Sequence, residues 1–461
     1  MILVIVLENY AYLVSSHNDS LACGTRGRPG FFVRTYGCQM NSRDSEKLSG
    51  LLLQLGYVQA ITQEEADLVL YNTCCVRESA EDRIFGNLGR LKRTKKDKPE
   101  LIIAVCGCMT QQPDIAEKIR TKHKYINLVF GTMNRHRLPE FLWRVISEKK
   151  QVIDISEETD LPELTDIPVT TREFPHKAGV NIMYGCDNFC SYCIVPYVRG
   201  REKSRPVEDI LKEVTALAED GVKEVMLLGQ NVNSFAPSFP ELLRKISYIP
   251  GIERIRFMTS HPKDCSDELI GIIKELPKVC DSIHLPIQSG STKVLEDMNR
   301  KYTKEDYLSL VHRLRTAIPN IAISTDIIVG YPGETEEDFL ETLDVVQKVR
   351  FSNAFTFLYS KRSGTPAALR TDTIPAKTAS ERFDRLIAEI SPIQFTINQE
   401  KIGQVLPVMV EEITPTDYKG RTGDHSLVHF TCPTPLKQGD IVSVKVTNAK
   451  TYYLTGEFSH V

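Results

Sequence analysis

Three cysteines stand close together near the middle of the chain, in a stretch that can do metal chemistry. Cys186, Cys190 and Cys193 follow a CxxxCxxC spacing. Three thiolates from one loop can ligate three irons of a 4Fe–4S cluster, because thiolate is the soft ligand that such clusters need. The fourth iron then has no protein ligand and can bind a small molecule. That arrangement suits the reductive cleavage of S-adenosylmethionine to a 5′-deoxyadenosyl radical.

A zinc loop is the alternative interpretation of this spacing. Zinc usually closes a tetrahedron of four ligands, and no fourth ligand lies close by in the sequence. Two aromatic residues, Phe189 and Tyr192, stand among the cysteines. They either contact the adenine of S-adenosylmethionine and shield the cluster from water, or simply pack. The loop therefore predicts an iron–sulfur site.

A second set of cysteines is spread over the first part of the chain. Cys38, Cys74 and Cys108 each follow a predicted strand. Because the carboxyl ends of parallel strands meet at one edge of a sheet, we expect the three sulfurs to converge on a second three-ligand cluster site. The strands expected before them are Phe31–Tyr36, Leu68–Asn72 and Leu101–Cys106.

The remaining cysteines have no such spacing. We interpret them as small apolar fillers rather than ligands. They are Cys23, Cys75, Cys106, Cys265, Cys280 and Cys432.

The elements around these cysteines fall into three patterned segments. Strands and helices alternate over residues 31–155, which predicts an α/β domain with a mostly parallel sheet. Six further β/α units over residues 176–400 predict a barrel or partial barrel, closed by the amphipathic stretch Ala376–Glu400. Short alternating strands over residues 401–461 predict a small antiparallel β-barrel.

Two further segments have no regular pattern. Residues 1–30 are expected to be a disordered or extended leader, and the acidic, proline-containing residues 156–175 a linker. The length of 461 residues agrees with about three domains. No apolar run approaches the roughly 20 residues that span a bilayer, so an integral membrane protein is excluded. Twelve cysteines without a secretory signal indicate a reduced, cytoplasmic protein.

The motifs together resemble the methylthiotransferase family of radical S-adenosylmethionine enzymes, and above all its MiaB-type branch. The resemblance runs from about Phe31 to the C-terminus. The matching strings are Thr35–Asn41, Asn72–Cys74, Gly107–Met109, Tyr184–Tyr197, Arg199–Glu202, Leu228–Asn233 and His284–Ser291.

The resemblance implies a domain order and two cofactor sites. Residues 31–155 would be the methylthiotransferase domain, 176–400 the radical domain and 401–461 a TRAM domain. Cys38, Cys74 and Cys108 would hold an auxiliary 4Fe–4S cluster, and the CxxxCxxC loop the radical cluster. Two S-adenosylmethionine molecules would be used: one methylates a sulfur carried on the auxiliary cluster, and the other gives the radical.

The resemblance also implies a reaction and its partners. The methylthio group would join carbon 2 of isopentenyladenosine next to the anticodon of tRNA. Alternatives are threonylcarbamoyladenosine in tRNA, an aspartate of a ribosomal protein, or a non-enzymatic iron–sulfur protein with an RNA-binding module. A reductant protein such as flavodoxin or ferredoxin would supply electrons, and we expect a monomer.

Several residues beyond the cysteines are candidates for contact with S-adenosylmethionine. Gly229 and Gln230 end the second strand of the predicted barrel, where ligands of such barrels bind. Ser289 follows the fourth strand, and Thr325 and Asp326 lie on the fifth. A simple turn is the alternative at Gly229.

Contact with RNA is predicted at local basic patches, because the net charge of −3 excludes a wholly basic protein. A solvated face is the alternative for each patch. Aromatic residues in the C-terminal module suit base stacking. The candidates are Arg90, Lys92, Arg93, Lys95, Lys96 and Lys98; Arg199, Arg201, Lys203 and Arg205; and Tyr418, Lys419, Arg421, His425 and Phe430.

Overall fold

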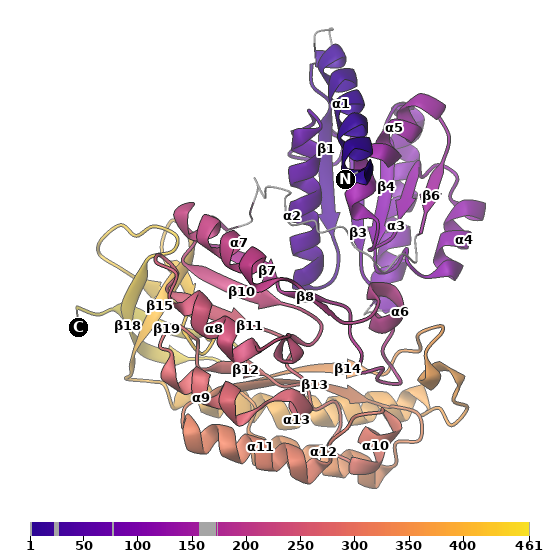
Figure 1. The fold of residues 1–461 in the computed structure, drawn as a ribbon. Helices are drawn as coiled ribbons and strands as arrows, with labels where there is room; N and C mark the ends of the chain where they lie inside the picture. The colour runs from indigo at the N-terminus through magenta and orange to yellow at the C-terminus, as the bar shows by residue number, and fades with distance from the viewer. Residues whose placement is uncertain (1, 23–26, 76–77, 156–171, 173, 461) are drawn as a thin grey trace. The chain divides into compact units, whose positions relative to one another are not determined.

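The chain folds into two compact units (Figure 1). One unit contains Met1–Glu173 together with Ile194–Arg201, and the other contains Phe174–Cys193 and Glu202–Val461. The structure, a computed structural model, describes all residues except 1, 23–26, 76–77, 156–171, 173 and 461. Most of the predicted linker, 156–175, therefore lies outside the described residues.

The first unit is built on a six-stranded sheet in which every strand pair is parallel. The strand order is β2-β1-β3-β4-β5-β6. This confirms the predicted α/β fold with a parallel sheet, and adds two short strands at its edges, β2 and β6. The strands are β1 (Gly30–Thr35), β2 (Val58–Gln59), β3 (Leu68–Thr73), β4 (Ile102–Gly107), β5 (Leu128–Phe130) and β6 (Val152–Asp154).

Helices cover both faces of this sheet. On one face α2 buries Leu48 and Leu52 in a core that also contains Phe130 and Phe141. On the other face α3 and α4 pack on Tyr71 and its neighbours. The helices are α2 (Gln39–Gln54), α3 (Glu78–Asp97), α4 (Pro113–Lys122), the 3-10 turn η1 (Arg135–Arg137) and α5 (Leu138–Glu148).

The prediction of a disordered leader is wrong for most of its length. Residues Ile2–Ala22 form helix α1, which lies beside α5 (Figure 1). Val14 of α1 is buried in the same core as Leu48 and Phe141. The side-chain amide of Asn18 donates to the Leu55 carbonyl at 2.8 Å. The sequence did not predict this helix, because the apolar residues from Ile2 to Leu7 are consecutive and show no helical period. Residues 23–26 lie outside the description.

Six parallel strands form the partial barrel of the second unit, as predicted. They make two three-stranded sheets, β11-β10-β7 and β12-β13-β14, and an isolated parallel bridge joins Ile255 of β11 to Val279 just before β12. The strands are β7 (Lys177–Asn181), β10 (Glu224–Leu228), β11 (Arg254–Phe257), β12 (Ser282–His284), β13 (Ala322–Val329) and β14 (Asn353–Leu358).

Helices alternate with these strands. The turn at Gly330–Glu334 leads into a helix that begins with a capping box at Thr335. A two-stranded antiparallel ribbon, β8 (Met183–Tyr184) with β9 (Lys203–Ser204), flanks the cysteine loop. The helices are α7 (Val207–Glu219), α8 (Phe239–Ser247), α9 (Asp267–Glu275), α10 (Thr292–Asp297), α11 (Lys304–Ala317), α12 (Glu336–Val349) and α13 (Ala376–Gln399), with 3-10 turns at Val232–Ser234, Pro262–Asp264 and Pro366–Leu369.

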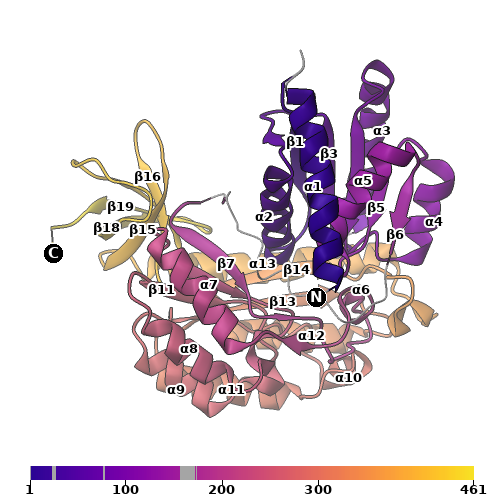
Figure 2. The same cartoon turned by 45° about the horizontal axis from the view of Figure 1, so that its top comes forward.

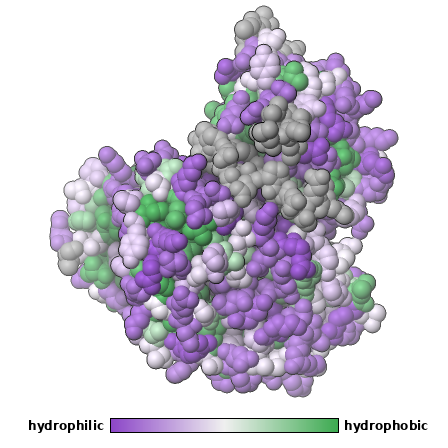
Figure 3. Space-filling view, in the orientation of Figure 1, coloured by the Kyte–Doolittle hydropathy of each residue, from purple (hydrophilic) through white to green (hydrophobic). Residues whose placement is uncertain are grey.

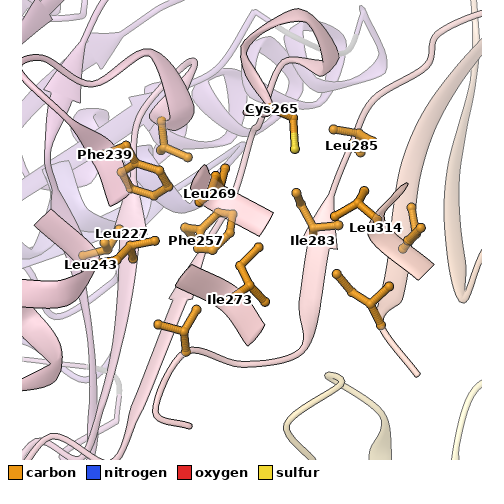
Figure 4. Close-up of a cluster of buried hydrophobic side chains, with 14 of the residues drawn as sticks. Leu227, Phe239, Leu243, Phe257, Cys265, Leu269, Ile273, Ile283, Leu285 and Leu314 are labelled. Carbon is orange, nitrogen blue, oxygen red and sulfur yellow. The ribbon is translucent and has the colours of Figure 1, made fainter. Parts of the chain in front are cut away.

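The core of the barrel is a continuous apolar layer between strands and helices (Figure 4). Leu227 and Phe257 of the strands meet Phe239 of α8, and Cys265 lies among the same apolar side chains. Cys265 is buried, and burial raises the pKa of its thiol to about 12. These facts agree with the interpretation of Cys265 as an apolar filler.

The C-terminal strands close into a five-stranded barrel in the order β15-β16-β17-β19-β18. All pairs are antiparallel except β17 with β19, which are parallel. The predicted small barrel is confirmed, with this one parallel pair as the difference. The strands are β15 (Val405–Ile413), β16 (Tyr418–Arg421), β17 (Leu427–Thr431), β18 (Ile441–Ala449) and β19 (Leu454–Phe458).

Two buried arginines attach this small barrel to the partial barrel. Arg254, the first residue of β11, donates to the carbonyls of Pro407 and Arg421 at 2.8 and 2.7 Å. Arg256 donates to the carbonyls of Thr422 and Gly423 and pairs with Glu224 at 3.0 Å. The contact uses the amino ends of β10 and β11, and Figure 2 shows the small barrel beside β11.

The surface has an ordinary polar character. On the face shown in Figure 3, hydrophilic residues predominate and hydrophobic residues occur in small groups. Among the described residues, no helix is both long and apolar enough to cross a membrane.

Candidate iron–sulfur and cofactor sites

The CxxxCxxC loop begins directly after β8 and forms hydrogen bonds to the C-terminal end of α10. Within the loop, the Cys193 amide donates to the Cys190 carbonyl at 2.9 Å. The Ser191 hydroxyl donates to the Asp297 carbonyl at 2.7 Å, and the Ser191 amide to the Met298 carbonyl at 3.0 Å. These hydrogen bonds attach the middle of the cysteine loop to the partial barrel.

Two side chains that the sequence did not single out complete this support. Arg300 is buried and donates to the Cys190 sulfur at 3.5 Å and to the Pro286 carbonyl at 2.7 Å. The side-chain amide of Asn299 donates to the Phe189 carbonyl at 2.9 Å. Neither residue belongs to a spacing that indicates chemistry, so only the folded chain could reveal them.

The loop cysteines differ in exposure: Cys190 is buried, whereas Cys186 and Cys193 are partly exposed. Burial raises the pKa of the Cys186 thiol, although a hydrogen bond from Asn188 to its sulfur, at 3.4 Å, acts in the opposite direction. A metal binds the thiolate and displaces the proton, so these thiols become anionic when they ligate iron. Tyr192 packs with Val294 and Tyr331 in an apolar cluster, which supports packing as its role.

The second set of cysteines lies where the sequence placed it. Cys38, Cys74 and Cys108 follow β1, β3 and β4, which are neighbours in the sheet. The loops touch one another: a Cβ built on Gly37 would lie 2.8 Å from the Cys74 sulfur, and the Cys108 amide donates to the Thr73 carbonyl at 3.0 Å. Gly37 has φ +116°, so this close approach needs glycine.

The three sulfurs differ in access. Cys38 is exposed, whereas Cys74 and Cys108 are buried. Within the part of the chain that the structure describes, no group of three or more cysteine, histidine or acidic side chains is already closed around a metal position. None of the eleven described cysteines is in a disulfide, so thiolates are available as ligands. Cys23 lies outside the described residues.

Cys75 is closer to this site than the sequence suggested. Its thiol forms a hydrogen bond with Cys108, and both pack with Ile194 and Val198 in one small apolar cluster. This hydrogen bond lowers the pKa of the Cys108 thiol, against the opposite effect of burial and with further help from Arg199. The sequence alone does not show which of two adjacent cysteines points into the protein. Their orientation depends on where the preceding strand ends.

Arg199 and Arg205 are not the phosphate contacts that the sequence predicted, because both side chains are buried. Arg205 pairs with Glu213 at 2.7 Å. Arg199 lies in the segment Ile194–Arg201, which belongs to the first unit and includes α6 (Val195–Arg199). Its guanidinium donates to the Cys108 sulfur at 3.2 Å. A basic run in a sequence does not show which members turn inward.

The candidates for contact with S-adenosylmethionine fall into two groups. Ser289 and Thr325 are fully buried; the Thr325 hydroxyl accepts from the Ile287 amide at 2.9 Å and donates to the Leu285 carbonyl at 3.0 Å. Their hydroxyls therefore stabilise loops of the protein. Asp326 differs, because its carboxylate is partly exposed and lies 3.3 Å from His284 Nε2.

Gly229 and Gln230 follow β10 at the carboxyl end of the partial barrel. A Cβ on Gly229 would lie 2.5 Å from the Met183 side chain, so a larger residue does not fit there. Gly229 and Gln230 therefore lie at the carboxyl end of the partial barrel, where the cysteine loop also starts. Contact with S-adenosylmethionine at Gly229, Gln230 and Asp326 stays a prediction.

The other predicted RNA contacts are also divided by the structure. On α3, Lys95 donates to the Asn127 side chain at 2.7 Å, and Lys98, just after α3, pairs with Asp67 at 2.8 Å. The other members of this basic run, Arg90, Lys92, Arg93 and Lys96, are exposed.

In the small barrel, Phe430 is a core residue stacked on Tyr418 and cannot stack on a base. Burial lowers the pKa of His425 to about 3. Tyr452 of this module is exposed, at 71%.

Comparison with known proteins assigns families to the same three segments. The Radical SAM superfamily matches residues 180–346, a TRAM domain matches residues 399–458, and the family described as "Uncharacterized protein family UPF0004" matches residues 30–131. Among solved structures, the radical S-adenosylmethionine methyltransferase TsrM from Kitasatospora setae has a TM-score of 0.55 at 15% identity, over 74% of this chain and 75% of that one. This likeness concerns the fold alone.

Curated relatives are far closer in sequence. A protein from Lachnoclostridium phytofermentans is 52% identical over 94% of this chain and 96% of its own, and one from Clostridioides difficile is 46% identical over 97% and 95%. Both carry the name tRNA-2-methylthio-N(6)-dimethylallyladenosine synthase. Since such identity extends through both cysteine sets and the terminal barrel, the chain belongs to the family of tRNA-2-methylthio-N(6)-dimethylallyladenosine synthases.

Proposed function

We propose that this protein transfers a methylthio group to carbon 2 of isopentenyladenosine next to the anticodon of tRNA. The observation that carries the proposal is the presence of two separate three-cysteine sets, each at the carboxyl end of a parallel α/β unit, in a chain of this family. One set suits a radical site, and the other suits a site for the sulfur that is transferred.

The residues present fit two 4Fe–4S clusters and S-adenosylmethionine. Cys186, Cys190 and Cys193 would hold one cluster, and a set of Cys38, Cys74 and Cys108 would hold the other. When bound, these groups supply the radical chemistry that an unactivated aromatic C–H bond requires. The fit rests on donor chemistry: both sets offer three thiols and leave one iron position open.

The charges around the second set support this fit. Asp44, Arg135 and Arg199 form one buried ion-pair chain, with N–O distances of 2.7 and 3.1 Å. Two cations and one carboxylate leave one excess positive charge. A thiolate at Cys108, in contact with Arg199, balances it. A buried charge needs such a partner, so the site favours an anionic sulfur.

The side chains around the loop act by holding it. Arg300, Asn299 and Ser191 fix the cysteine loop against the barrel, and Asp326 presents a partly exposed carboxylate from within β13, beside His284 at the end of β12. We propose that this carboxylate, with Gly229 and Gln230, contacts S-adenosylmethionine. Water is excluded from the base of the loop by Tyr192, Val294 and Tyr331.

Nucleoside analysis of tRNA tests the proposal. A deletion strain should lack 2-methylthio-isopentenyladenosine and accumulate isopentenyladenosine, and the wild-type gene should restore it. Cys186→Ala and Cys38→Ala should fail to restore it, whereas the control Cys432→Ala should succeed. A missing methylthio mark on threonylcarbamoyladenosine, or on a ribosomal protein, with isopentenyladenosine modification intact would favour the alternative substrates instead.

The two cysteine sets should separate in vitro. Cys186→Ala should abolish 5′-deoxyadenosine formation by the anaerobically reconstituted protein, because the radical cluster loses a ligand. Cys108→Ala should keep measurable cleavage of S-adenosylmethionine but form no methylthio product. Normal methylthio product from Cys108→Ala would contradict the assignment of the second set.

We also propose that the exposed face of α3 contacts tRNA phosphates. Arg90, Arg93 and Lys96 are exposed there, and the Lys118 ammonium lies 3.8 Å from the centre of the Phe85 ring of the same helix. Changing Arg90, Arg93 and Lys96 together to Gln should weaken tRNA binding and reduce the slope of log K against log salt, by about 1 per lost phosphate contact.

The matched control for this experiment is Lys377→Gln on α13, whose side chain is 89% exposed. It should leave both the affinity and the slope unchanged. An unaltered slope in the triple variant would show that α3 is only a solvated face.

Finally, we propose the organisation in which this reaction runs. Residues 31–155, 176–400 and 401–461 act as methylthiotransferase, radical and TRAM domains of a cytoplasmic monomer. A reductant protein such as flavodoxin or ferredoxin supplies the electrons. Light scattering of the purified protein tests the monomer, and 5′-deoxyadenosine yield with each reductant tests the donor.

A further inference from the structure

A buried arginine contacts one sulfur of the second cysteine set. The Arg199 side chain is 5% exposed, and its Nε donates to the Cys108 sulfur at 3.2 Å. The same guanidinium donates to Asn41 Oδ1 at 2.6 Å and to Asp44 Oδ2 at 3.1 Å. Three acceptors therefore fix one planar group, which a lysine cannot reproduce because it lacks the fork of donors.

The acceptors are themselves fixed. The Asn41 amide nitrogen donates to the carbonyls of Tyr36 and Thr73, both at 2.9 Å, so its oxygen remains for Arg199. The same oxygen of Asp44, Oδ2, also accepts from the Arg135 guanidinium at 2.7 Å. The position of the guanidinium is thus set by the ends of β1 and β3 and by α2, the elements that also carry Cys38 and Cys74.

The backbone around Arg199 is anchored in the same place. The Thr132 hydroxyl donates to the Val198 carbonyl, and Ile194 and Val198 pack against Cys75 and Cys108. The segment Ile194–Arg201, called the strap below, follows the last cysteine of the CxxxCxxC loop directly in sequence. Arg199 therefore contacts Cys108 of the second cysteine set from a segment that directly follows the first set in the sequence.

We propose that Arg199 is a positioning residue that fixes Cys108 and raises the reduction potential of the cluster held by Cys38, Cys74 and Cys108. An N–H donor and a positive charge at a ligand sulfur stabilise the reduced, more negative cluster more than the oxidised one. The inference rests on the proposed function, because it takes these cysteines as ligands. It adds a residue that neither the cysteine spacing nor the basic run assigned to this role.

The test isolates the second cluster. Cys186, Cys190 and Cys193 are all changed to Ala in the full-length chain, and the protein is reconstituted anaerobically. Iron content and an EPR-monitored redox titration are then compared for this parent and for three additions: Arg199→Met, Arg199→Lys and the control Arg201→Met. Arg201 is exposed and lies in the same strap.

The expected result is a graded shift. Arg199→Met should have a more negative midpoint potential than the parent at equal iron content, Arg199→Lys should lie between them, and Arg201→Met should match the parent. An unchanged potential in a fully loaded Arg199→Met protein would overturn the inference.

The Arg199→Lys variant distinguishes an effect on the cluster from a folding defect. If Arg199→Met loses iron while Arg199→Lys loads it at a shifted potential, the inference stands. If Arg199→Met is misfolded by circular dichroism and Arg199→Lys has the parent's potential, Arg199 is only a structural residue and the inference fails. A parent that binds no iron at all would instead overturn the ligand assignment of the proposed function, and this inference with it.

Discussion

The sulfur of Cys190 accepts a hydrogen bond from Arg300, and this contact leads to a prediction at the scale of one residue. Arg300→Met removes the donors to Cys190 and to the Pro286 carbonyl. A loop displaced by even about 1 Å can lower a rate on the order of a hundredfold. We therefore expect 5′-deoxyadenosine yield per bound iron to fall on the order of tenfold to a hundredfold.

The neighbouring variant Lys301→Met is the matched control, because Lys301 is exposed. It should keep the parent yield. Equal yields per iron in the two variants would show that Arg300 supports folding without positioning the cysteine loop.

Residues with a fixed spacing were the easiest to find from the sequence. Cysteine is soft and rare, so its spacing carries information by itself, and the strands before Cys38, Cys74 and Cys108 placed them at one sheet edge. Arginine is common on surfaces, and its role depends on what it faces. Arg199 and Arg205 belonged to a basic run, yet the fold turns both side chains inward.

At the scale of an element, the start of α12 offers a test that depends on pH. The Asp338 carboxylate accepts from Lys293 at 2.8 Å and from Ser291 at 2.7 Å, and forms a capping box with Thr335. Burial would raise the pKa of Asp338, but the hydrogen bonds from Lys293, Ser291 and Thr335 outweigh it and lower the pKa to about 2.

The sign of the effect follows from this direction. The folded pKa lies below the ordinary value of 3.8, so the carboxylate stabilises the protein above that pH and stops doing so as pH falls from about 4 to 2. Asp338→Asn should lower the free energy of unfolding by about 1–2 kcal/mol at pH 7. Urea titrations of wild type and variant at several pH values would measure this difference.

The control for this helix is Glu337→Gln, which lies in the same first turn and is exposed. It should change the free energy of unfolding by less than about 0.5 kcal/mol. A difference for Asp338→Asn that is as large at pH 3 as at pH 7 would contradict the role of the charge.

Elements with a clear period were predicted well, and those without one were missed. The leucine stripe of α2 and the alternation in the C-terminal strands each showed one face toward a core. The sequence of α1 shows no such spacing, because it opens with a consecutive run of apolar residues. The short strands β2 and β6 are stabilised by pairing at the sheet edges, a tertiary effect that a local pattern does not contain.

At the scale of the whole molecule, the attachment of the small barrel is the feature to test. Arg256 bonds to two carbonyls of the small barrel and pairs with the buried Glu224. Arg256→Met leaves that carboxylate without its partner, and breaking a buried pair in this way costs about 3–5 kcal/mol. We expect a lower urea midpoint for the full chain and faster proteolytic release of residues after about Gly403.

Arg313→Met serves as the control, because its ion pair with Asp267 lies at the surface. It should change stability by no more than about 1 kcal/mol. The double variant Arg256→Met with Glu224→Gln should recover part of the loss. Equal stability of Arg256→Met and Arg313→Met would show that the small barrel is held by its other contacts.

The domain order of the molecule could be predicted from the sequence, but the path of the chain between domains could not. The predicted radical domain, 176–400, contains the strap, yet the strap belongs to the first compact unit. Composition and period report local burial only. They carry no information on which sheet a short, half-polar segment such as Val195–Arg199 packs against.

The strap has a consequence for how the protein is synthesised. The last strand of the first sheet, β6, ends at Asp154, but Arg199 lies well downstream of it. A nascent chain that has just released β6 from the ribosome exposes Cys108 with neither its guanidinium partner nor the cover of Ile194 and Val198. The first unit can be completed only after translation has passed residue 201, so its own fragment, expressed alone, would leave this thiol open to air oxidation.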